Sequence, residues 1–499
     1  MTLKVLIELR PAFDGHAGIP QEARLLFRGL QGLDDIAVEG LLQSSNLVVE
    51  KGLTPTEAAN GAVHGSTQYI DRLSRVVISL QQGAASNRIE HLRRKVLKLF
   101  GPLGAALGSV LGFKVALSVF DPTHFKDFVW RALFAKSLPI EDLEITTNAG
   151  FRILRWPWSL ANALGVATSA LGHALYPRLD TRGIDLMVVE TPYPGRVSRG
   201  TQLVVRYHDA IPLLMPHTIK NRGFHRAMHL EALKRNAADG AWFACVSEAT
   251  RQDLLSLMPG LEGRAVTIPN MISHQFVREQ ASSSRVPEII WSRKNRLAPC
   301  EGGAPIDPAD FEDGELPYLL MVSTIEPRKN HLGLLDAWEL LRSAGHEHLN
   351  LVFVGALGWE HDAIARRLAP WLVRGGLHLL EDVPATDLRL LYRHARATVC
   401  PSFGEGFDFA GVEAMRSGGV VAASDIRVHR DVYGEAAEYF SPYSASEIAD
   451  GISRVIAPQN APRRSALIAE GERVSAQYLP ASVLPQWQAF LRSISSTKR

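Results

Sequence analysis

The feature that most constrains this chain is a stretch near its C-terminal end that combines a strand, a glycine loop and a helix. Residues 397–400 form an apolar run typical of a buried strand, and residues 411–417 have helical spacing that ends at a glycine pair. The loop between them points backbone N–H groups and the positive end of a helix toward an anion. Glu405 and Glu413 bracket this loop with seven residues between them. Carboxylates only accept hydrogen bonds, so the pair suits a hydroxyl-rich ligand such as ribose or a hexose.

Composition limits the class of protein. At 499 residues the chain is long enough for two or three domains, and 46% apolar and 21% charged residues are ordinary for a globular protein. Basic and acidic residues nearly balance, 54 against 52, so charge gives no case for a nucleic-acid partner. The three cysteines have no metal-ligand spacing, and Cys245 and Cys400 end apolar runs where we expect buried thiols. The first apolar run is too short for a signal peptide, so we expect a cytoplasmic location.

Alternation of strands and helices organises the first part of the chain. Apolar runs predict strands at 3–9, 184–190, 203–206 and 241–246. A loop that contains Gly18 follows the first strand, and Pro20 opens a helix. His208 follows the third of these strands, at the edge where open α/β sheets place ligands. Ser247 follows the fourth and is a natural helix N-cap.

The same alternation returns in the last third of the chain. Strands are predicted at 318–323, 349–354, 376–380, 397–400 and 420–423. Arg328 and Lys329 lie in the loop after the first of them, before a helix that Asn330 caps. An arginine with paired N–H donors and a lysine with a point charge together suit a diphosphate. A simple surface pair is disfavoured, because cations oppose the positive end of a helix unless an anion is present.

In this order, the stretches resemble the retaining glycosyltransferases of family four, which have the GT-B fold. The motifs that carry the resemblance are Glu405–Glu413, His208-Asp209, Val246–Arg251 and Ile268–Asn270. The resemblance covers residues 1–30 and 184–499 and implies two Rossmann-like, doubly wound α/β domains that face a cleft. It predicts an N-terminal acceptor-side domain at 1–278 with a helical insertion at about 45–150, a linker at 279–316, a nucleotide-sugar-binding domain at 317–477 and a terminal helix at 478–499 that returns to the first domain.

The resemblance also implies roles for individual residues. Arg328 and Lys329 bind the donor phosphates and stabilise the leaving nucleotide, and Glu405 holds sugar hydroxyls near the reacting carbon. His208 approaches the donor sugar, and Glu413 holds the ribose hydroxyls. The further positions that match donor contacts are Gly18, Thr324, Val383, Gly406, Phe407 and Asp408.

The chain departs from the family pattern at three of its positions. Thr324 stands where many members have arginine, so we assign the arginine role to Arg328. Asp408 stands where glycine is usual and Ala410 where proline is usual. Aspartate tolerates a positive φ better than most residues, so we expect the turn to survive.

Several segments are similar to bacterial mannosyl- and rhamnosyltransferases of surface polysaccharide and lipopolysaccharide assembly, among them 326–330, 191–196 and 208–212. The expected activity is metal-independent transfer of a hexose, with retention, to a glycan or lipid-linked glycan. GDP-mannose is the first expected donor, and GDP-rhamnose, dTDP-rhamnose and UDP-sugars stay open. No cofactor or metal is expected, since no Asp-x-Asp follows a strand. A catalytically inactive sugar-nucleotide-binding protein is the alternative of another class.

One segment of the unassigned region stands out by its charge. Basic residues from Arg88 to Lys98 precede an uncharged run at 99–113, which is too short and too rich in glycine for a confident membrane span. A basic segment before an apolar one can lie on an anionic membrane surface, here the inner face of the plasma membrane. A buried helical hairpin with a solvated basic start is the other interpretation. The sequence leaves this choice and the oligomeric state open.

Overall fold

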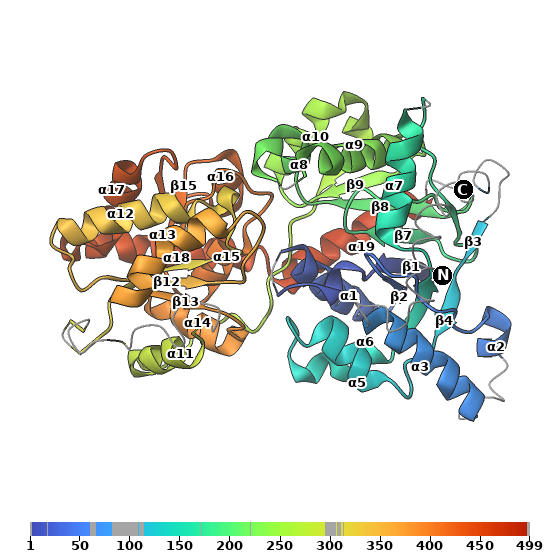
Figure 1. Cartoon of the computed structure of the whole chain (residues 1–499), viewed down its shortest axis with the longest axis horizontal. Helices are drawn as coiled ribbons and strands as arrows, with labels where there is room; N and C mark the ends of the chain where they lie inside the picture. The colour runs from blue at the N-terminus through green and yellow to red at the C-terminus, as the bar shows by residue number, and fades with distance from the viewer. Residues whose placement is uncertain are drawn as a thin grey trace.

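The computed structural model describes residues 2–16, 18–59, 66–81, 108, 114–170, 172–219, 221–294, 306, 311–312 and 314–496. Two α/β domains lie side by side in it, each built around its own sheet (Figure 1). The N-terminal domain is drawn in blue to green, and the C-terminal domain in yellow to red. The two doubly wound domains predicted from the sequence are therefore present.

The sheet of the N-terminal domain has the strand order β10-β9-β8-β7-β1-β2-β5-β4 in the described part of the chain. Its strands are β1 Leu3–Glu8, β2 Ile36–Gln43, β4 Ser118–Phe120, β5 Gly150–Leu154, β7 Leu186–Val189, β8 Gln202–Tyr207, β9 Trp242–Cys245 and β10 Ala265–Thr267. All these pairings are parallel except that of β4 with β5. β3 (Lys114–Ala116) and β6 (Arg178–Asp180) form a separate small sheet. Parallel strands place all their carboxyl ends, and the loops that follow, at one edge.

Helices cover both faces of this sheet. They are α1 Ile19–Gln31, α2 Pro55–Ala59, α3 Thr67–Gln81, α5 Lys126–Val129, α6 Leu143–Thr147, α7 Trp158–Ser169, α8 Ile211–Leu214, α9 Arg222–Ala238 and α10 Glu248–Leu257. Ser247 caps α10 as predicted, because its hydroxyl accepts a hydrogen bond from the Thr250 N–H. Gly18 precedes α1 with a φ of 73°, a conformation that glycine adopts without strain.

The C-terminal domain has a wholly parallel sheet in the order β13-β12-β11-β14-β15-β16 among the residues described. Its strands are β11 Tyr318–Val322, β12 Asn350–Val354, β13 Leu377–Leu380, β14 Ala397–Cys400, β15 Val421–Ser424 and β16 Ala437–Phe440. Its helices are α11 Val286–Ser292, α12 His331–Ser343, α13 Asp362–Arg374, α14 Ala385–His394, α15 Phe409–Arg416, α16 Arg427–Tyr433, α17 Ala445–Ile456 and α18 Ala461–Ala476. Cys245 and Cys400 are buried free thiols, as predicted.

The terminal helix α19 (Pro480–Ser496) lies against the N-terminal domain, where its red ribbon runs among blue and green elements (Figure 1). Trp487 and Leu491 are fully buried in the core of that domain. The Gln488 amide donates a hydrogen bond to Asp35 at 2.5 Å. The chain therefore returns to its first domain after completing the second.

The region at about 45–150 is more than a helical insertion. β4 extends the main sheet as its antiparallel edge strand, and Tyr69 and Leu73 of α3 lie in the domain core. Sequence periodicity missed β4 because a three-residue strand shows too little alternation to detect. The segment at 88–113 lies outside the described residues except for Gly108, so its membrane interpretation stays a prediction. Among the described helices, none has both the length and the apolar character needed to cross a bilayer.

Candidate functional site

The carboxyl-end loops of the two sheets meet and form one site. The Ser247 hydroxyl, at the end of β9, donates to the Gly406 carbonyl in the loop after β14 at 2.7 Å. A Cβ atom added at Gly406 would lie 1.8 Å from the His208 carbonyl oxygen after β8. Glycine is therefore required at 406 because the backbone of the other domain occupies the space of a side chain.

Three predicted residues form a cluster in the C-terminal domain, which we call the donor-side cluster: Arg328, Lys329 and Glu405. Arg328 donates to Glu405 at 2.7 Å and to the Gly404 carbonyl at 2.8 Å, and Lys329 donates to the other Glu405 oxygen at 2.6 Å. Burial raises the pKa of Glu405, but the charges of Arg328 and Lys329 outweigh it and bring the pKa below its usual value. The carboxylate therefore stays charged and pairs with both cations, and Arg328 also pairs with Glu326 at 2.7 Å.

Asp408 ends the glycine loop in the way that its backbone tolerance predicts. Its φ is 65°, and α15 starts directly after it at Phe409, two residues earlier than helical spacing indicated. Its carboxylate lies 3.2 Å from Nε2 of the buried His429. Burial raises the pKa of Asp408, but the hydrogen bond from His429 and the charge of Lys329 outweigh burial and bring the pKa below its usual value. His429 was missed because a histidine on α16 has no sequence signal for this contact.

Glu413 lies one turn inside α15 and is 5% exposed. It accepts hydrogen bonds from Gln21 of α1 at 2.7 Å and from the Tyr392 hydroxyl at 3.2 Å. Burial raises its pKa to about 7 despite these bonds. Gln21 thus occupies the carboxylate to which the resemblance assigns the ribose hydroxyls. Sequence reasoning missed this residue, since nothing local links the start of α1 to a position 392 residues later.

His208 sits on a buried chain of acidic residues that the sequence did not indicate. Its Nε2 lies 3.1 Å from Glu190, whose backbone N–H donates to Glu8 at 3.0 Å. Burial lowers the pKa of His208 to about 4, and the nearby charge of Arg206 lowers it too. Burial raises the pKa of Glu190 to about 8. A neutral histidine and a protonated carboxyl therefore face each other at neutral pH.

The other residues predicted to contact the donor differ in their exposure and in the space around them. Thr324 is exposed in the loop after β11, and Val383 is half-buried just before α14. A side chain at Gly18 would meet nothing within 4 Å, so there is room beside it. The Phe407 ring packs against Phe409 and Tyr478 in the domain core, with ring centres 5.3 and 5.1 Å away. Only the backbone of Phe407 is left for a ligand.

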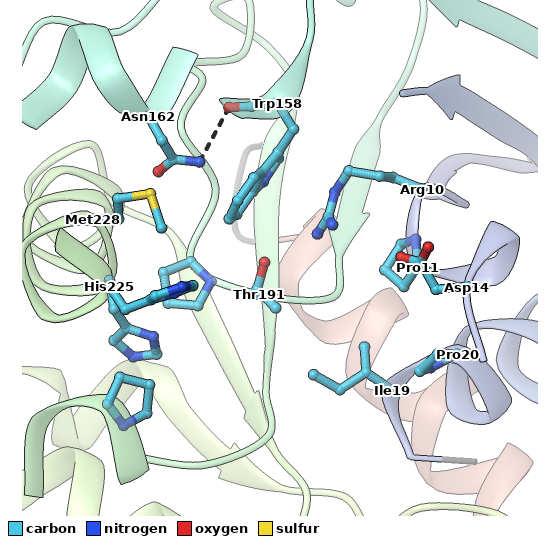
Figure 2. A pocket seen from close by; sticks show the side chains of 13 residues that line it. Arg10, Pro11, Asp14, Ile19, Pro20, Trp158, Asn162, Thr191, His225 and Met228 are labelled. Carbon is cyan, nitrogen blue, oxygen red and sulfur yellow. Dashed lines mark hydrogen bonds between the residues drawn. The ribbon is translucent and has the colours of Figure 1, made fainter. Parts of the chain in front are cut away.

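A pocket of about 290 Å³ opens at the carboxyl edge of the N-terminal sheet (Figure 2). The loops after β1 and β7 form part of its wall, through Arg10, Asp14 and Thr191. The helices α7 and α9 supply Trp158, Asn162, His225, Met228 and His229, and the starts of α1 and α8 also line the pocket. We call it the N-domain pocket. Sequence analysis placed a ligand at these strand ends but identified none of the helical residues, because they come from outside the motifs.

Comparison with known proteins supports the predicted glycosyltransferase family for the C-terminal domain. Residues 306–474 match the family model described as glycosyl transferases group 1. The O-antigen chain mannosyltransferase B of Escherichia coli is 37% identical over 131 residues, which are 26% of this chain and 34% of that protein. The serotype-specific mannosyltransferase WbdA of E. coli is 37% identical over 153 residues, 30% of this chain and 18% of that protein. The matches thus span about a third or less of these relatives.

Solved structures match the whole chain in fold. The sucrose-phosphate synthase of Thermosynechococcus elongatus superposes with a TM-score of 0.58 at 14% identity, over 100% of both chains. Anabaena Alr3699/HepE in complex with UDP gives 0.54 at 13% identity, over 99% of this chain and 100% of that one. The GT-B fold predicted from the sequence is confirmed.

Proposed function

We propose, from the premise that this chain is a family-four-like GT-B glycosyltransferase, that it transfers mannose from GDP-mannose to a hydroxyl group of a glycan or lipid-linked glycan. The acceptor belongs to a bacterial surface polysaccharide of the O-antigen type. Support for the sugar and the pathway comes from the names of partial relatives, among them an O-antigen chain mannosyltransferase of Salmonella typhimurium that is 28% identical over 125 residues.

The observation that carries this proposal is the donor-side cluster. Arg328 and Lys329 are each only 14% exposed and converge on one carboxylate at the carboxyl ends of β11 and β14. Two cations in so sheltered a place can turn to a diphosphate that enters between them and the start of α15. When they do, Glu405 is released from one or both partners and can accept hydrogen bonds from the sugar hydroxyls.

The proposed reaction exchanges the oxygen on the anomeric carbon and moves one proton. The acceptor oxygen bonds to the anomeric carbon while the bond from that carbon to the phosphate oxygen breaks, and the departing phosphate takes the acceptor proton. Attack from the same face gives retention. Arg328, Lys329 and the N–H groups at the start of α15 offset the charge that grows on the phosphate, a role that needs no metal ion. His208 faces the sugar as a neutral hydrogen-bonding group.

A thermal-shift panel of GDP, UDP, dTDP and ADP with their sugar nucleotides, without and with EDTA, tests the donor. A bound nucleotide raises the melting temperature as its concentration passes the dissociation constant. We expect a response to GDP and GDP-mannose that survives EDTA and is lost in Arg328→Ala. Arg367→Ala is the matched control, because Arg367 is a half-exposed arginine that pairs with Asp336 and Glu339 on the outside of the domain.

The other outcomes each point to one alternative. A response to UDP or dTDP would keep the fold and replace the donor. A response with no transfer to any glycan would favour a catalytically inactive sugar-nucleotide-binding protein. Nuclear magnetic resonance of the anomeric proton in the product tests retention, and an inverted product would overturn the proposed mechanism.

A further inference from the structure

We infer that the N-domain pocket is a subsite for an uncharged sugar unit of the acceptor, with the Trp158 ring as the surface on which that sugar stacks. The inference rests on the proposed function, because it names the acceptor class for the same transfer. It assigns roles to Trp158 and Asn162, which no motif of the chain singles out, and to Thr191, the first residue of the segment 191–196. A phosphate-bearing end of a lipid-linked acceptor is the competing ligand class, and the charges in the pocket disfavour it.

The first observation is a set of unused polar atoms. Three lining residues each hold a buried side-chain atom without a hydrogen-bond partner among the described residues: Nε1 of Trp158, Oδ1 of Asn162 and Oγ1 of Thr191. Asn162 is 1% exposed, and its amide nitrogen is held by the Trp158 carbonyl at 3.1 Å, which fixes the orientation of the unused oxygen. Buried polar groups are normally satisfied, so three such atoms around one cavity point to a hydroxyl-rich ligand. An N–H donor, an amide acceptor and a hydroxyl that does both match the two-way hydrogen bonding of sugar hydroxyls.

The second observation is that the described residues lining the pocket include no unpaired lysine or arginine. Arg10 is the one lysine or arginine among the described residues that line the pocket, and it donates to the buried Glu8 at 2.7 Å. Burial lowers the pKa of His229 to about 4, and its Nε2 lies 3.2 Å from the Tyr207 hydroxyl. Asp14 adds a negative charge to the wall. A phosphate would therefore meet no unpaired lysine or arginine among the described lining residues, whereas a neutral sugar needs no counter-charge.

The third observation is the aromatic surface. The Arg10 guanidinium lies 4.4 Å from the centre of the Trp158 ring and holds one face of it. Figure 2 shows Arg10 on one side of this ring and Met228 and His225 on the other. The face away from Arg10 is the one that can take the C–H face of a sugar ring, since flat rings bury large apolar area.

Size and position agree with this assignment. A volume of about 290 Å³ lies at the lower end of small-molecule sites, which run from roughly 300 to 1,000 Å³, so the pocket suits a short saccharide and not a lipid chain. Ile19, beside the loop glycine Gly18, and Pro212, in the helix after His208, both line it. The pocket therefore adjoins the elements to which the resemblance assigns the donor sugar.

Calorimetric titration of the full chain with α-linked mannobiose, in the presence of saturating GDP, tests the subsite. We expect saturable binding that weakens about tenfold or more in Trp158→Ala, because both the stacking surface and the N–H donor are lost. Trp158→Phe keeps an aromatic ring and loses only the N–H donor, so its mannobiose affinity should lie between those of the parent and Trp158→Ala. Trp291→Ala is the matched control, since Trp291 is 57% exposed on α11 of the other domain, and it should bind as the parent does.

A thermal shift with GDP, measured in every variant, separates this inference from the proposed function. A normal GDP response in Trp158→Ala with weakened mannobiose binding supports the subsite and shows that the variant is folded. Mannobiose affinity that is unchanged in both Trp158 variants, or no mannobiose binding in a parent that responds to GDP, would overturn it. Tighter, Trp158-dependent binding of mannose 1-phosphate would also overturn it. Trp158-dependent mannobiose binding without any nucleotide response would leave the subsite standing and contradict the proposed function.

Discussion

The donor-side cluster and the N-domain pocket face the same site but satisfy their polar groups in opposite ways. In the C-terminal part of the site the predicted charged groups have internal partners: Arg328 and Lys329 hold Glu405, and Gln21 and Tyr392 hold Glu413. In the pocket Arg10 is also paired, but Trp158, Asn162 and Thr191 keep neutral polar atoms without partners among the described residues. The donor-side cluster thus consists of charged groups that pair with one another, whereas the N-domain pocket contains neutral polar atoms that have no hydrogen-bond partner among the described residues.

This difference follows from the free-energy penalty for burying each kind of group without a partner. An unpaired buried charge is penalised far more than an unpaired hydroxyl or amide, so a charged site must be neutralised by its own residues between turnovers. Neutral atoms can stay without partners for about 1–3 kcal/mol each. Under the proposed function, a donor must therefore displace existing hydrogen bonds, whereas an acceptor sugar forms hydrogen bonds with atoms that have no partner.

The largest effect is expected where the donor-side pairing is broken directly. Arg328→Ala should lower kcat by about 10²–10³, because one preorganised donor to the developing phosphate charge is removed. Initial rates at saturating GDP-mannose measure this, with Arg367→Ala as the control for a surface arginine. A loss below about fivefold would show that Lys329 and the helix start suffice without Arg328.

The next effect concerns the contact between the two halves of the site. Gly406→Ala should lower kcat/KM by about 10²-fold, since its Cβ would collide with the His208 carbonyl and displace the loop that carries Glu405. Gly434→Ala tests glycine loss away from the contact, because a Cβ at Gly434 would meet nothing within 4 Å although its φ of 52° carries strain. Equal losses in the two variants would mean that contact between the domains does not set the rate.

A smaller effect is expected at the carboxylate that Gln21 occupies. Glu413→Ala should weaken nucleotide binding about 10- to 100-fold, the range for hydrogen bonds to a charged group. Gln21→Ala should act in the opposite direction and tighten binding, because the nucleotide then displaces one hydrogen bond fewer. Titration with GDP measures both, with Glu472→Ala on α18 as the control. Unchanged affinity in Glu413→Ala would remove the ribose assignment.

The smallest effect is a pH dependence of stability that arises from Glu190, the carboxyl group beside His208. Burial and the charge of Glu8 raise the pKa of Glu190 to about 8, against the lowering charges of Arg206 and Arg10. The folded state therefore holds a proton that the unfolded state releases near pH 4.5, so this group's contribution to stability is lost as pH rises toward 8. His208 acts in the opposite sense, because its pKa of about 4 lets the unfolded state bind more protons below pH 6.5.

Glu190→Gln should accordingly flatten the fall in melting temperature between about pH 5 and 8 by a few degrees. Parallel melting curves of the parent and variant across this range measure the difference. Glu39→Gln, in a half-buried pair with Arg152 across β2 and β5, is the control. Curves that stay parallel from pH 5 to 8 would show that Glu190 is ionised in the folded protein.

Local patterns in the sequence were enough to predict β1, β7–β9 and β11–β15, the capping residues and the loops that carry Arg328, Lys329 and Glu405, but they did not indicate β2, β5, β10 or β16. Each depends on residues a few positions apart, such as Ser247 with Thr250 or the strand β14 before the glycine loop. The positive φ of Asp408 could be predicted for the same reason. β4 could not, because an edge strand of three residues is specified by its partner β5 and not by its own sequence.

The sequence by itself thus determined most strands of the two sheets and the motif side chains at their carboxyl edges, because periodicity and motif spacing are local properties. Only the tertiary structure decided which of those groups are already partnered. Gln21 meets Glu413, Glu190 meets His208 and His429 meets Asp408 through the packing of distant elements. The N-domain pocket likewise exists only where α7 and α9 pack beside the ends of β1 and β7, since a cavity is a property of the assembled surfaces and not of any one segment.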